Sequence, residues 1–172
     1  MNHGQRRALS DLADKQAISE VIYRYCRGLD RLDAAMLATV YHHDAQEDRG
    51  AGIYVGSAHG MAPVALRHLA LNFSSSQHFI GNILIELRGV TAFVESYFQA
   101  YHRYADRPGT PATEVMMAGR YLDRFERRAG EWRIAHRRMD MDWTRTQQVQ
   151  ESWMDRHPGA HRGDRSPAGA RL

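Results

Sequence analysis

At 172 residues the chain has the length of a single domain, and its 43% hydrophobic and 25% charged residues are typical of a folded, soluble protein rather than a disordered one. A net charge of +3 is too small to indicate a nucleic-acid partner, and no segment approaches the roughly 20 apolar residues of a membrane span. The only cysteine, Cys26, excludes an intrachain disulfide. Because the N-terminus has no apolar run of signal-peptide length, we expect a cytoplasmic protein.

The first part of the chain shows mainly helical patterns. Apolar residues recur at helical spacing over residues 9–29, and the following DRLD indicates a break before a shorter helix at 34–41. The stretch HHDAQEDRGAGIYVG, residues 42–56, indicates a turn and a weak hairpin in which IYV is the clearest strand. A third helix is predicted over residues 60–73, with Pro63 in its first turn, where a missing N–H costs little.

The region from residue 76 onward has the composition and alternation of strands. Turn signals at RG, DRPGTP and RRAG divide it into four predicted strands at 77–87, 91–104, 113–126 and 131–143. Because a block of helices precedes long antiparallel strands, the pattern predicts an α+β fold.

The domain boundaries follow from where these patterns begin and end. We predict a short N-terminal tail at residues 1–8, one folded domain at 9–146 and a C-terminal tail at 147–172. The C-terminal tail is rich in Gly, Pro and Arg, and we expect it to be flexible or to pack on a neighbouring subunit.

Asp30 and His78 are candidate catalytic residues because of where they stand in these elements. Asp30 ends the first predicted helix, where the helix dipole disfavours an acid, although capping of the next helix is an alternative explanation. His78 lies at the head of a predicted strand in phase with Ile80, so it either points into an apolar interior or is an ordinary histidine at a strand end. In the last predicted strand, alternation leaves open whether Arg137 or Arg138 faces the interior.

No motif indicates a metal or an organic cofactor. The sequence contains no HExxH, paired CxxC, Walker-type or GxSxG motif. The adjacent ligand types of His42, His43 and Asp44 would need further residues to form a metal site. We therefore expect neither a metal nor a cofactor.

Three stretches of the sequence resemble a known family. YRYCRGLD at 23–30, HFIGNILIEL at 78–87 and FERRAGEWRIAHRR at 125–138 resemble the SnoaL-like branch of the NTF2-like superfamily, over residues 10–146 in all. Within that branch the chain is similar to bile-acid 7α-dehydratases, to γ-hexachlorocyclohexane dehydrochlorinase and, more distantly, to scytalone dehydratase. The resemblance implies a cone fold, in which a curved mixed or antiparallel sheet wraps around helices and encloses a pocket.

The resemblance also implies roles for particular residues. His78 would be a general base that Asp30 orients. Tyr25 would hydrogen-bond the leaving group or a carbonyl oxygen, and Arg137 would assist if it points inward. The pocket around them would be shaped by Tyr54, Phe98, Tyr101, Met117 and Met139.

The implied activity is that of a cofactor-independent lyase, a dehydratase acting on a hydrophobic polycyclic or terpenoid-like small molecule. A double-bond isomerase or a polyketide-type cyclase could use the same pocket, and a non-catalytic ligand-binding module or a dioxygenase β-type subunit is an alternative from another class. The resemblance further implies a homo-oligomer, a trimer rather than a dimer. The small net charge and the lack of a long apolar segment predict neither a nucleic acid nor a membrane as partner.

Overall fold

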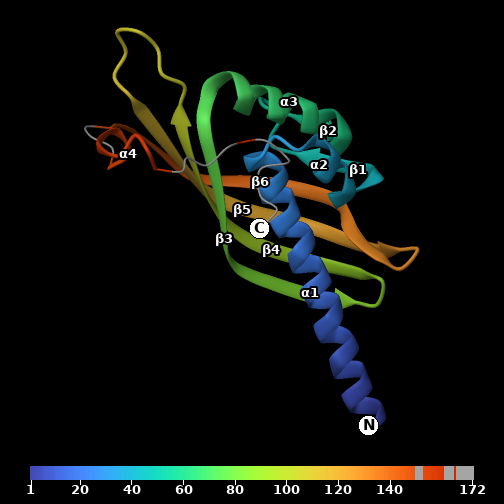
Figure 1. The fold of residues 1–172 in the computed structure, drawn as a ribbon. Helices are drawn as coiled ribbons and strands as arrows, with labels where there is room; N and C mark the ends of the chain where they lie inside the picture. The colour runs from blue at the N-terminus through green and yellow to red at the C-terminus, as the bar shows by residue number, and fades with distance from the viewer. Residues whose placement is uncertain (150–152, 161–164, 166–172) are drawn as a thin grey trace.

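The computed structural model describes residues 1–149, 153–160 and 165. Two strands lie between the second and third helices, four long strands follow the third helix, and a short fourth helix comes last (Figure 1). The helices are α1 (His3–Asp30), α2 (Ala34–Val40), α3 (Ala58–Asn72) and α4 (Trp153–Arg156). The strands are β1 (Tyr41–Asp48), β2 (Val55–Ser57), β3 (Phe73–Arg88), β4 (Thr91–Tyr104), β5 (Thr113–Arg128) and β6 (Glu131–Gln148).

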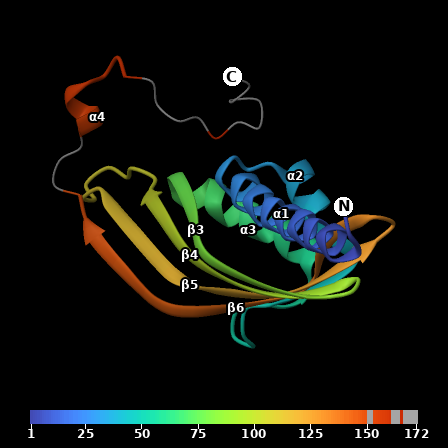
Figure 2. The same ribbon diagram turned by 90° about the horizontal axis from the view of Figure 1, so that it is seen from below.

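The strands form one mixed sheet in the order β2-β1-β6-β5-β4-β3. β1 pairs with β6 in parallel, and the other neighbours are antiparallel. The sheet curves around α1 and α3, which lie on its concave side (Figure 2). Bulges accompany the curvature, since the strand register shifts between Gly81 and Ile83 and between Ala118 and Gly119. This architecture confirms the predicted α+β cone with a curved sheet, and the sheet is mixed and open.

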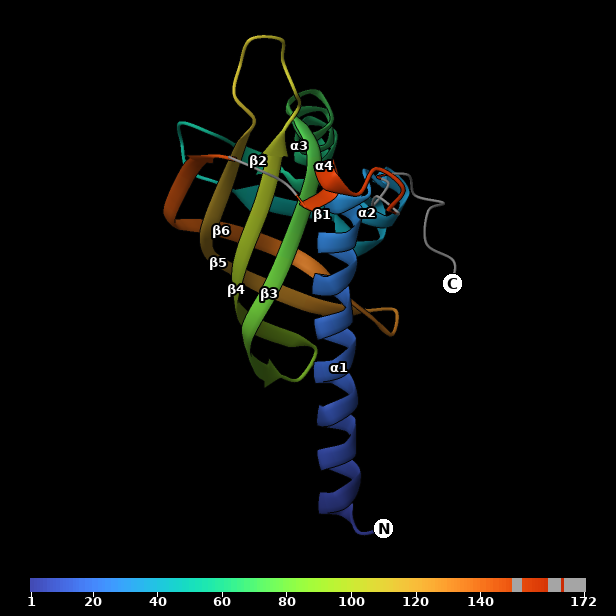
Figure 3. The same cartoon turned by 60° about the vertical axis from the view of Figure 1, so that its left-hand side comes forward.

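Helix α1 is longer than the sequence pattern predicted. It begins at His3 rather than at residue 9, because Asn2 and Gln5 form a capping box that satisfies backbone donors of the first turn. The N-terminal turns extend beyond the sheet (Figure 3), and Leu12 is exposed there. The C-terminal part of the helix buries its apolar stripe, as the periodicity predicted.

The predicted hairpin between α2 and α3 is present, but its strands differ from the prediction. Residues 42–48, where the pattern indicated no clear strand, belong to strand β1, whereas Ile53 and Tyr54 of the predicted IYV strand lie in the connection to β2. β1 pairs with both β2 and β6, so it is an integral part of the sheet. The hydrophobicity pattern did not indicate this strand because its composition is polar. One of its charged residues, Glu47, is nevertheless buried in an ion pair with Arg49.

The four long strands confirm the predicted strand block and extend its bounds. β3 begins at Phe73 rather than at residue 77, and β6 ends at Gln148 rather than at residue 143. As a result, the end of the sheet where β3 begins and β6 ends extends beyond the predicted strands.

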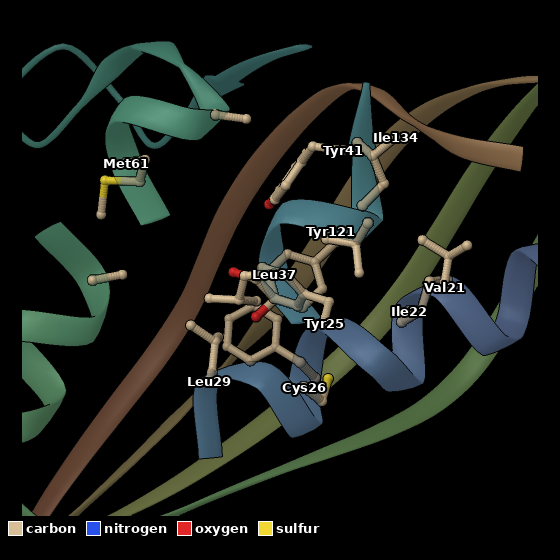
Figure 4. Close-up of a cluster of buried hydrophobic side chains, with 14 of the residues drawn as sticks. Val21, Ile22, Tyr25, Cys26, Leu29, Leu37, Tyr41, Met61, Tyr121 and Ile134 are labelled. Carbon is tan, nitrogen blue, oxygen red and sulfur yellow. The ribbon is translucent and has the colours of Figure 1, made fainter. Parts of the chain in front are cut away.

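The hydrophobic core lies between the helices and the concave side of the sheet. Figure 4 shows part of it, where Tyr25 and Leu37 from the helices meet Tyr121 and Ile134 from the strands. Helices α1, α2 and α3 each bury one face in this core. Within the described residues, no helix has both the length and the apolar character needed to cross a membrane.

Candidate active site

Asp30 and His78, 48 residues apart in the chain, meet at one end of the sheet. Asp30 is the last residue of α1, and His78 lies near the start of β3. One carboxylate oxygen of Asp30 lies 2.6 Å from Nδ1 of His78, and the other accepts the backbone N–H of His78 at 2.9 Å. The His78 side chain is only 7% exposed and that of Asp30 is 19% exposed. The two contacts together fix the imidazole relative to the end of the helix.

The end of α1 explains why the Asp30 carboxylate is available for this contact. The chain leaves the helix through Leu32, whose φ of 53° is left-handed, and the backbone N–H of Asp33 donates to the Gly28 carbonyl at 2.8 Å. Asp33 then caps α2, because its carboxylate accepts the backbone N–H of Met36 at 2.9 Å. The capping role that was the alternative for Asp30 therefore belongs to Asp33.

The contact with Asp30 also determines which nitrogen of His78 can act as a base. An ionised carboxylate only accepts hydrogen bonds, so the imidazole hydrogen lies on Nδ1, which faces Asp30. In the neutral ring, Nε2 then carries a lone pair. The geometry provides what a general base requires, a fixed ring whose second nitrogen has no hydrogen-bond partner among the described residues.

His102 of β4, which was not among the residues predicted for the site, lies beside His78. The two rings are edge-to-face with their centroids 5.4 Å apart, and Nδ1 of His102 lies 2.9 Å from Oγ of Ser76. Burial, and secondarily the neighbouring His78, lowers the pKa of His102 to about 4, so this imidazole is neutral at neutral pH. Strand alternation was the signal that could have identified it, because His102 is in phase with the buried residues Phe98 and Ala100.

A cavity of about 830 Å³ opens beside the two histidines. Its walls come from the C-terminal end of α1, the starts of β3 and β5, and the ends of β4 and β6. Among the residues predicted for the site, Asp30, His78 and Tyr101 line this cavity. Met116 of β5 also lines the cavity, whereas the predicted Met117 does not. The volume lies within the range of roughly 300–1,000 Å³ that is typical of small-molecule pockets.

The other residues predicted to shape the pocket lie elsewhere. Tyr54 donates its hydroxyl to a backbone carbonyl three residues later at 2.7 Å. Phe98 stacks on Tyr121 with ring centroids 4.5 Å apart. Met139, like Met117, is partly buried and packs against the hydrophobic core. These side chains are part of the fold around the site and do not line the cavity beside His78.

Tyr25 does not share the helix face of Asp30. Five residues of an α-helix rotate by about 500°, which places Tyr25 about 140° around the helix axis from Asp30. Its ring packs edge-on against Tyr41 and Tyr121 (Figure 4), and its hydroxyl accepts a hydrogen bond from Arg49 at 3.1 Å. Burial raises the pKa of the Tyr25 hydroxyl. The position implied for Tyr25 beside the reacting group is therefore not the one that the structure shows.

Arg137, and not Arg138, faces the interior. The Arg137 side chain is fully buried and donates two hydrogen bonds to Asp123, at 2.8 and 2.7 Å. Its guanidinium carbon lies 4.1 Å from the ring centroids of both Tyr25 and Tyr121. Burial alone would lower the pKa of Arg137, but Asp123 and the neighbouring tyrosines hold it well above its ordinary value. Arg138 is 59% exposed. Arg137 thus belongs to a buried ion pair and does not line the cavity beside His78.

The candidate metal ligands do not converge. Among the described residues, no group of three or more His, Cys, Asp or Glu side chains is close enough together to hold a metal ion. His42, from the predicted trio of ligand types, instead places Nε2 2.8 Å from the backbone carbonyl oxygen of Glu126.

The fold and the site together define a class of protein. An open, curved sheet encloses helices on its concave side, and a histidine held by a helix-terminal carboxylate lies at a cavity at one end, so the molecule is an α+β cone with a candidate acid–base site. A family model described as the SnoaL-like domain matches residues 10–138. The chain therefore belongs to the SnoaL-like domain family. A search of curated proteins finds no match.

Solved structures confirm the fold. A type 2 hexachlorocyclohexane dehydrochlorinase (LinA) has a TM-score of 0.72 and 19% sequence identity, over 95% of this chain and 99% of that one. A provisionally assigned scytalone dehydratase from Novosphingobium aromaticivorans has a TM-score of 0.70 and 20% identity, over 96% and 99% of the two chains. The Kfla4162 protein from Kribbella flavida has a TM-score of 0.70 and 16% identity, over 78% and 95%. At these identities the similarity establishes the fold, and the activity has to be argued from the site.

Proposed function

We propose that the protein is a cofactor-independent lyase that dehydrates a small molecule with a hydrophobic, polycyclic or terpenoid-like skeleton. The observation that carries this proposal is the two-point contact between Asp30 and His78 at a cavity of about 830 Å³. The presence of a dehydrochlorinase and a provisional dehydratase among proteins of this fold supports an elimination reaction.

In the proposed reaction, Nε2 of His78 accepts a proton from a carbon atom next to a carbonyl group. The electrons of that C–H bond form a new C=C bond while the neighbouring C–O bond breaks. Asp30 holds the ring and stabilises the imidazolium that forms. The imidazolium returns its proton to the departing hydroxide, which leaves as water. One histidine can serve both steps when the elimination is syn, and the enzyme ends in its starting state.

We assign Tyr25 and Arg137 to the supporting wall of the site rather than to the reacting atoms. Both are buried in a cluster with Tyr121 and Asp123, and neither lines the cavity beside His78. In this proposal their role is to hold α1 against the sheet, so that the end of the helix stays in register with β3.

The proposal is tested with a panel of polycyclic β-hydroxyketones. Dehydration produces a conjugated enone, which is followed by its ultraviolet absorbance, and a product that is lighter by one water, which is identified by mass spectrometry. His78→Gln should lower kcat by roughly 10²–10⁴-fold because the proton acceptor is lost. His43→Gln is the matched control, because His43 is an exposed histidine on β1.

Full turnover by a correctly folded His78→Gln variant would overturn the mechanism. A product of unchanged mass would instead identify an isomerase. Ligand binding without turnover of any panel member would favour the non-catalytic binding module.

We also propose that the chain forms a homo-oligomer, a trimer rather than a dimer, through the convex face of the sheet. Large apolar side chains on that face support this: Phe79, Leu84, Phe93 and Tyr97 are each at least 45% exposed in the single chain. Light scattering coupled to size-exclusion chromatography measures the mass directly. Phe93→Lys should shift the protein to monomer, and a wild-type monomer would overturn the proposal.

A further inference from the structure

Charged side chains form a large part of the polar lining of the cavity beside His78. Its lining, as far as the structure describes the chain, contains five arginines and two carboxylates. The arginines are Arg27, Arg31, Arg103, Arg145 and Arg165, and the carboxylates are Asp30 and Glu114. Positive charge therefore exceeds negative charge around this cavity.

Each of the two carboxylates is already engaged. Asp30 uses both of its oxygens on His78. Glu114 lies 3.4 Å from Nη1 of Arg103, at ion-pair distance on the neighbouring strand. Within the described residues, neither carboxylate forms an ion pair with Arg27 or Arg145.

The remaining arginines approach the cavity from separate elements. Arg27 comes from the last turns of α1 and Arg145 from the end of β6, and within the described residues neither forms an ion pair with a carboxylate. Arg165 donates Nη1 to the carbonyl oxygens of Leu69 and Phe73, at 3.0 and 2.6 Å. Because carbonyl oxygens carry no net charge, these bonds position the Arg165 guanidinium without cancelling its charge.

A cavity with cations on several sides and engaged carboxylates attracts an anionic group. The same cavity has apolar lining from Ile80 and Val115, which suits a hydrophobic skeleton. We propose that the substrate carries an anionic group, a carboxylate or a phosphate, on its apolar skeleton, and that Arg27 and Arg145 bind this group. The inference rests on the proposed function, because it takes the cavity beside His78 as the substrate site.

Two fluorescent probes test the preference for an anion. Anilinonaphthalene sulfonate and the uncharged phenylnaphthylamine share an apolar skeleton and differ by one sulfonate. In titrations of the full chain at low ionic strength, the sulfonate should bind at least about tenfold more tightly, and most of this preference should disappear in about 0.5 M salt. Equal affinities for the two probes would overturn the proposal.

Substitutions locate the preference in the cavity. Arg27→Gln and Arg145→Gln should each weaken binding of the sulfonate roughly three- to fivefold and leave binding of the neutral probe unchanged. Arg24→Gln is the matched control, because Arg24 is exposed on the same helix and does not line the cavity. Arg27→Lys keeps the charge and should keep most of the affinity. If Arg24→Gln weakens binding as much as Arg27→Gln does, the anion binds elsewhere and the inference is wrong.

Competition identifies the kind of anion. Naphthoate and naphthyl phosphate are compared with uncharged naphthol for displacement of the bound sulfonate probe. Stronger displacement by naphthoate assigns a carboxylate, stronger displacement by naphthyl phosphate assigns a phosphate, and displacement by neither anion better than by naphthol contradicts the proposal.

The binding assay requires no turnover, so it tests the anion preference independently of the lyase mechanism. His78→Gln should keep the preference for the sulfonate probe. A fully active His78→Gln variant with an intact anion preference would overturn only the lyase mechanism. Loss of turnover in that variant, combined with no anion preference in the wild type, would overturn only the present inference.

Discussion

Replacing Asp123 with asparagine tests whether the buried pair of Asp123 and Arg137 holds the fold together. Both side chains are completely buried, and two hydrogen bonds of 2.8 and 2.7 Å join them. Asp123→Asn leaves the Arg137 charge without its counter-ion in a site closed to water, which costs about 3–5 kcal/mol. That is a large share of a typical unfolding free energy of about 5–15 kcal/mol. With a urea m value of about 2 kcal/mol/M, the unfolding midpoint should fall by about 1.5–2.5 M.

A neighbouring exposed pair provides the control. The Arg138 and Asp140 side chains are 59% and 24% exposed and form an ion pair on the same strand as Arg137. Asp140→Asn should therefore change the unfolding free energy by only about 0.5 kcal/mol. In the double variant Asp123→Leu with Arg137→Met, no unpaired charge remains, and at least half of the stability lost in Asp123→Asn should return.

The same variants decide whether Arg137 takes part in the chemistry. A shift of less than about 1 kcal/mol for Asp123→Asn would refute the buried-charge argument. Because neither Asp123 nor Arg137 lines the cavity, the folded double variant should keep the turnover and probe binding of the wild type. A folded double variant without turnover would restore the catalytic role first implied for Arg137.

Three further predictions follow from burial and packing. Because burial lowers the pKa of His102 from 6.5 to about 4, the unfolded chain binds a proton between these pH values that the folded chain does not. The unfolding free energy should therefore decrease by up to about 3 kcal/mol as the pH falls through this window, and His102→Gln should flatten that slope in urea titrations. Burial raises the pKa of Cys26 to about 12, so a disulfide reagent at neutral pH should label the native thiol slowly and the urea-unfolded thiol rapidly. A Cβ on Gly119 would lie 2.2 Å from the Asp140 carbonyl oxygen, whereas one on Gly81 would meet only a ring atom at 3.8 Å. Gly119→Ala should thus lower the thermal midpoint strongly while Gly81→Ala does not, and equal midpoints would contradict the close approach of β5 and β6 at Gly119.

The positions of Asp30 and His78, the candidate catalytic pair, could be predicted because both residues stand at the ends of strongly patterned elements. Helical periodicity placed the end of the first helix near Asp30, and a run of β-branched residues placed the start of a strand near His78. Periodicity alone could not show that the two residues meet, since that depends on how the sheet curves around the helix. The resemblance to the SnoaL-like branch supplied that step.

The rest of the site could not be predicted because it depends on pairing in three dimensions. A hydrophobicity pattern treats charged residues as exposed, but Asp123, Arg137 and Glu47 are all buried with charged partners. The polar sequence of β1 was misjudged for the same reason. A match to a family pattern compares the spacing of residues along the chain, but it does not show in which direction each side chain points. Tyr25, five residues before Asp30, lies on a different side of the helix and points into the core instead of the cavity.

The two carboxylate oxygens of Asp30 contribute differently to stability and to the proposed catalysis, and Asp30→Asn distinguishes the two contributions. One oxygen accepts the backbone N–H of His78 and the other accepts Nδ1–H. An asparagine has only one carbonyl oxygen, so one of these donors loses its acceptor. If the amide N–H₂ faces the ring, the imidazole changes tautomer to accept from it, and Nε2 then carries the hydrogen and cannot take a proton. Asp30→Asn should therefore lower kcat by roughly 10²-fold or more while reducing stability by only about 1–3 kcal/mol.

Asp30→Ala removes both contacts and should reduce stability further. If Asp30→Asn keeps its kcat but loses as much stability as Asp30→Ala, the carboxylate serves only to anchor β3 to the helix, and the base mechanism loses its main support.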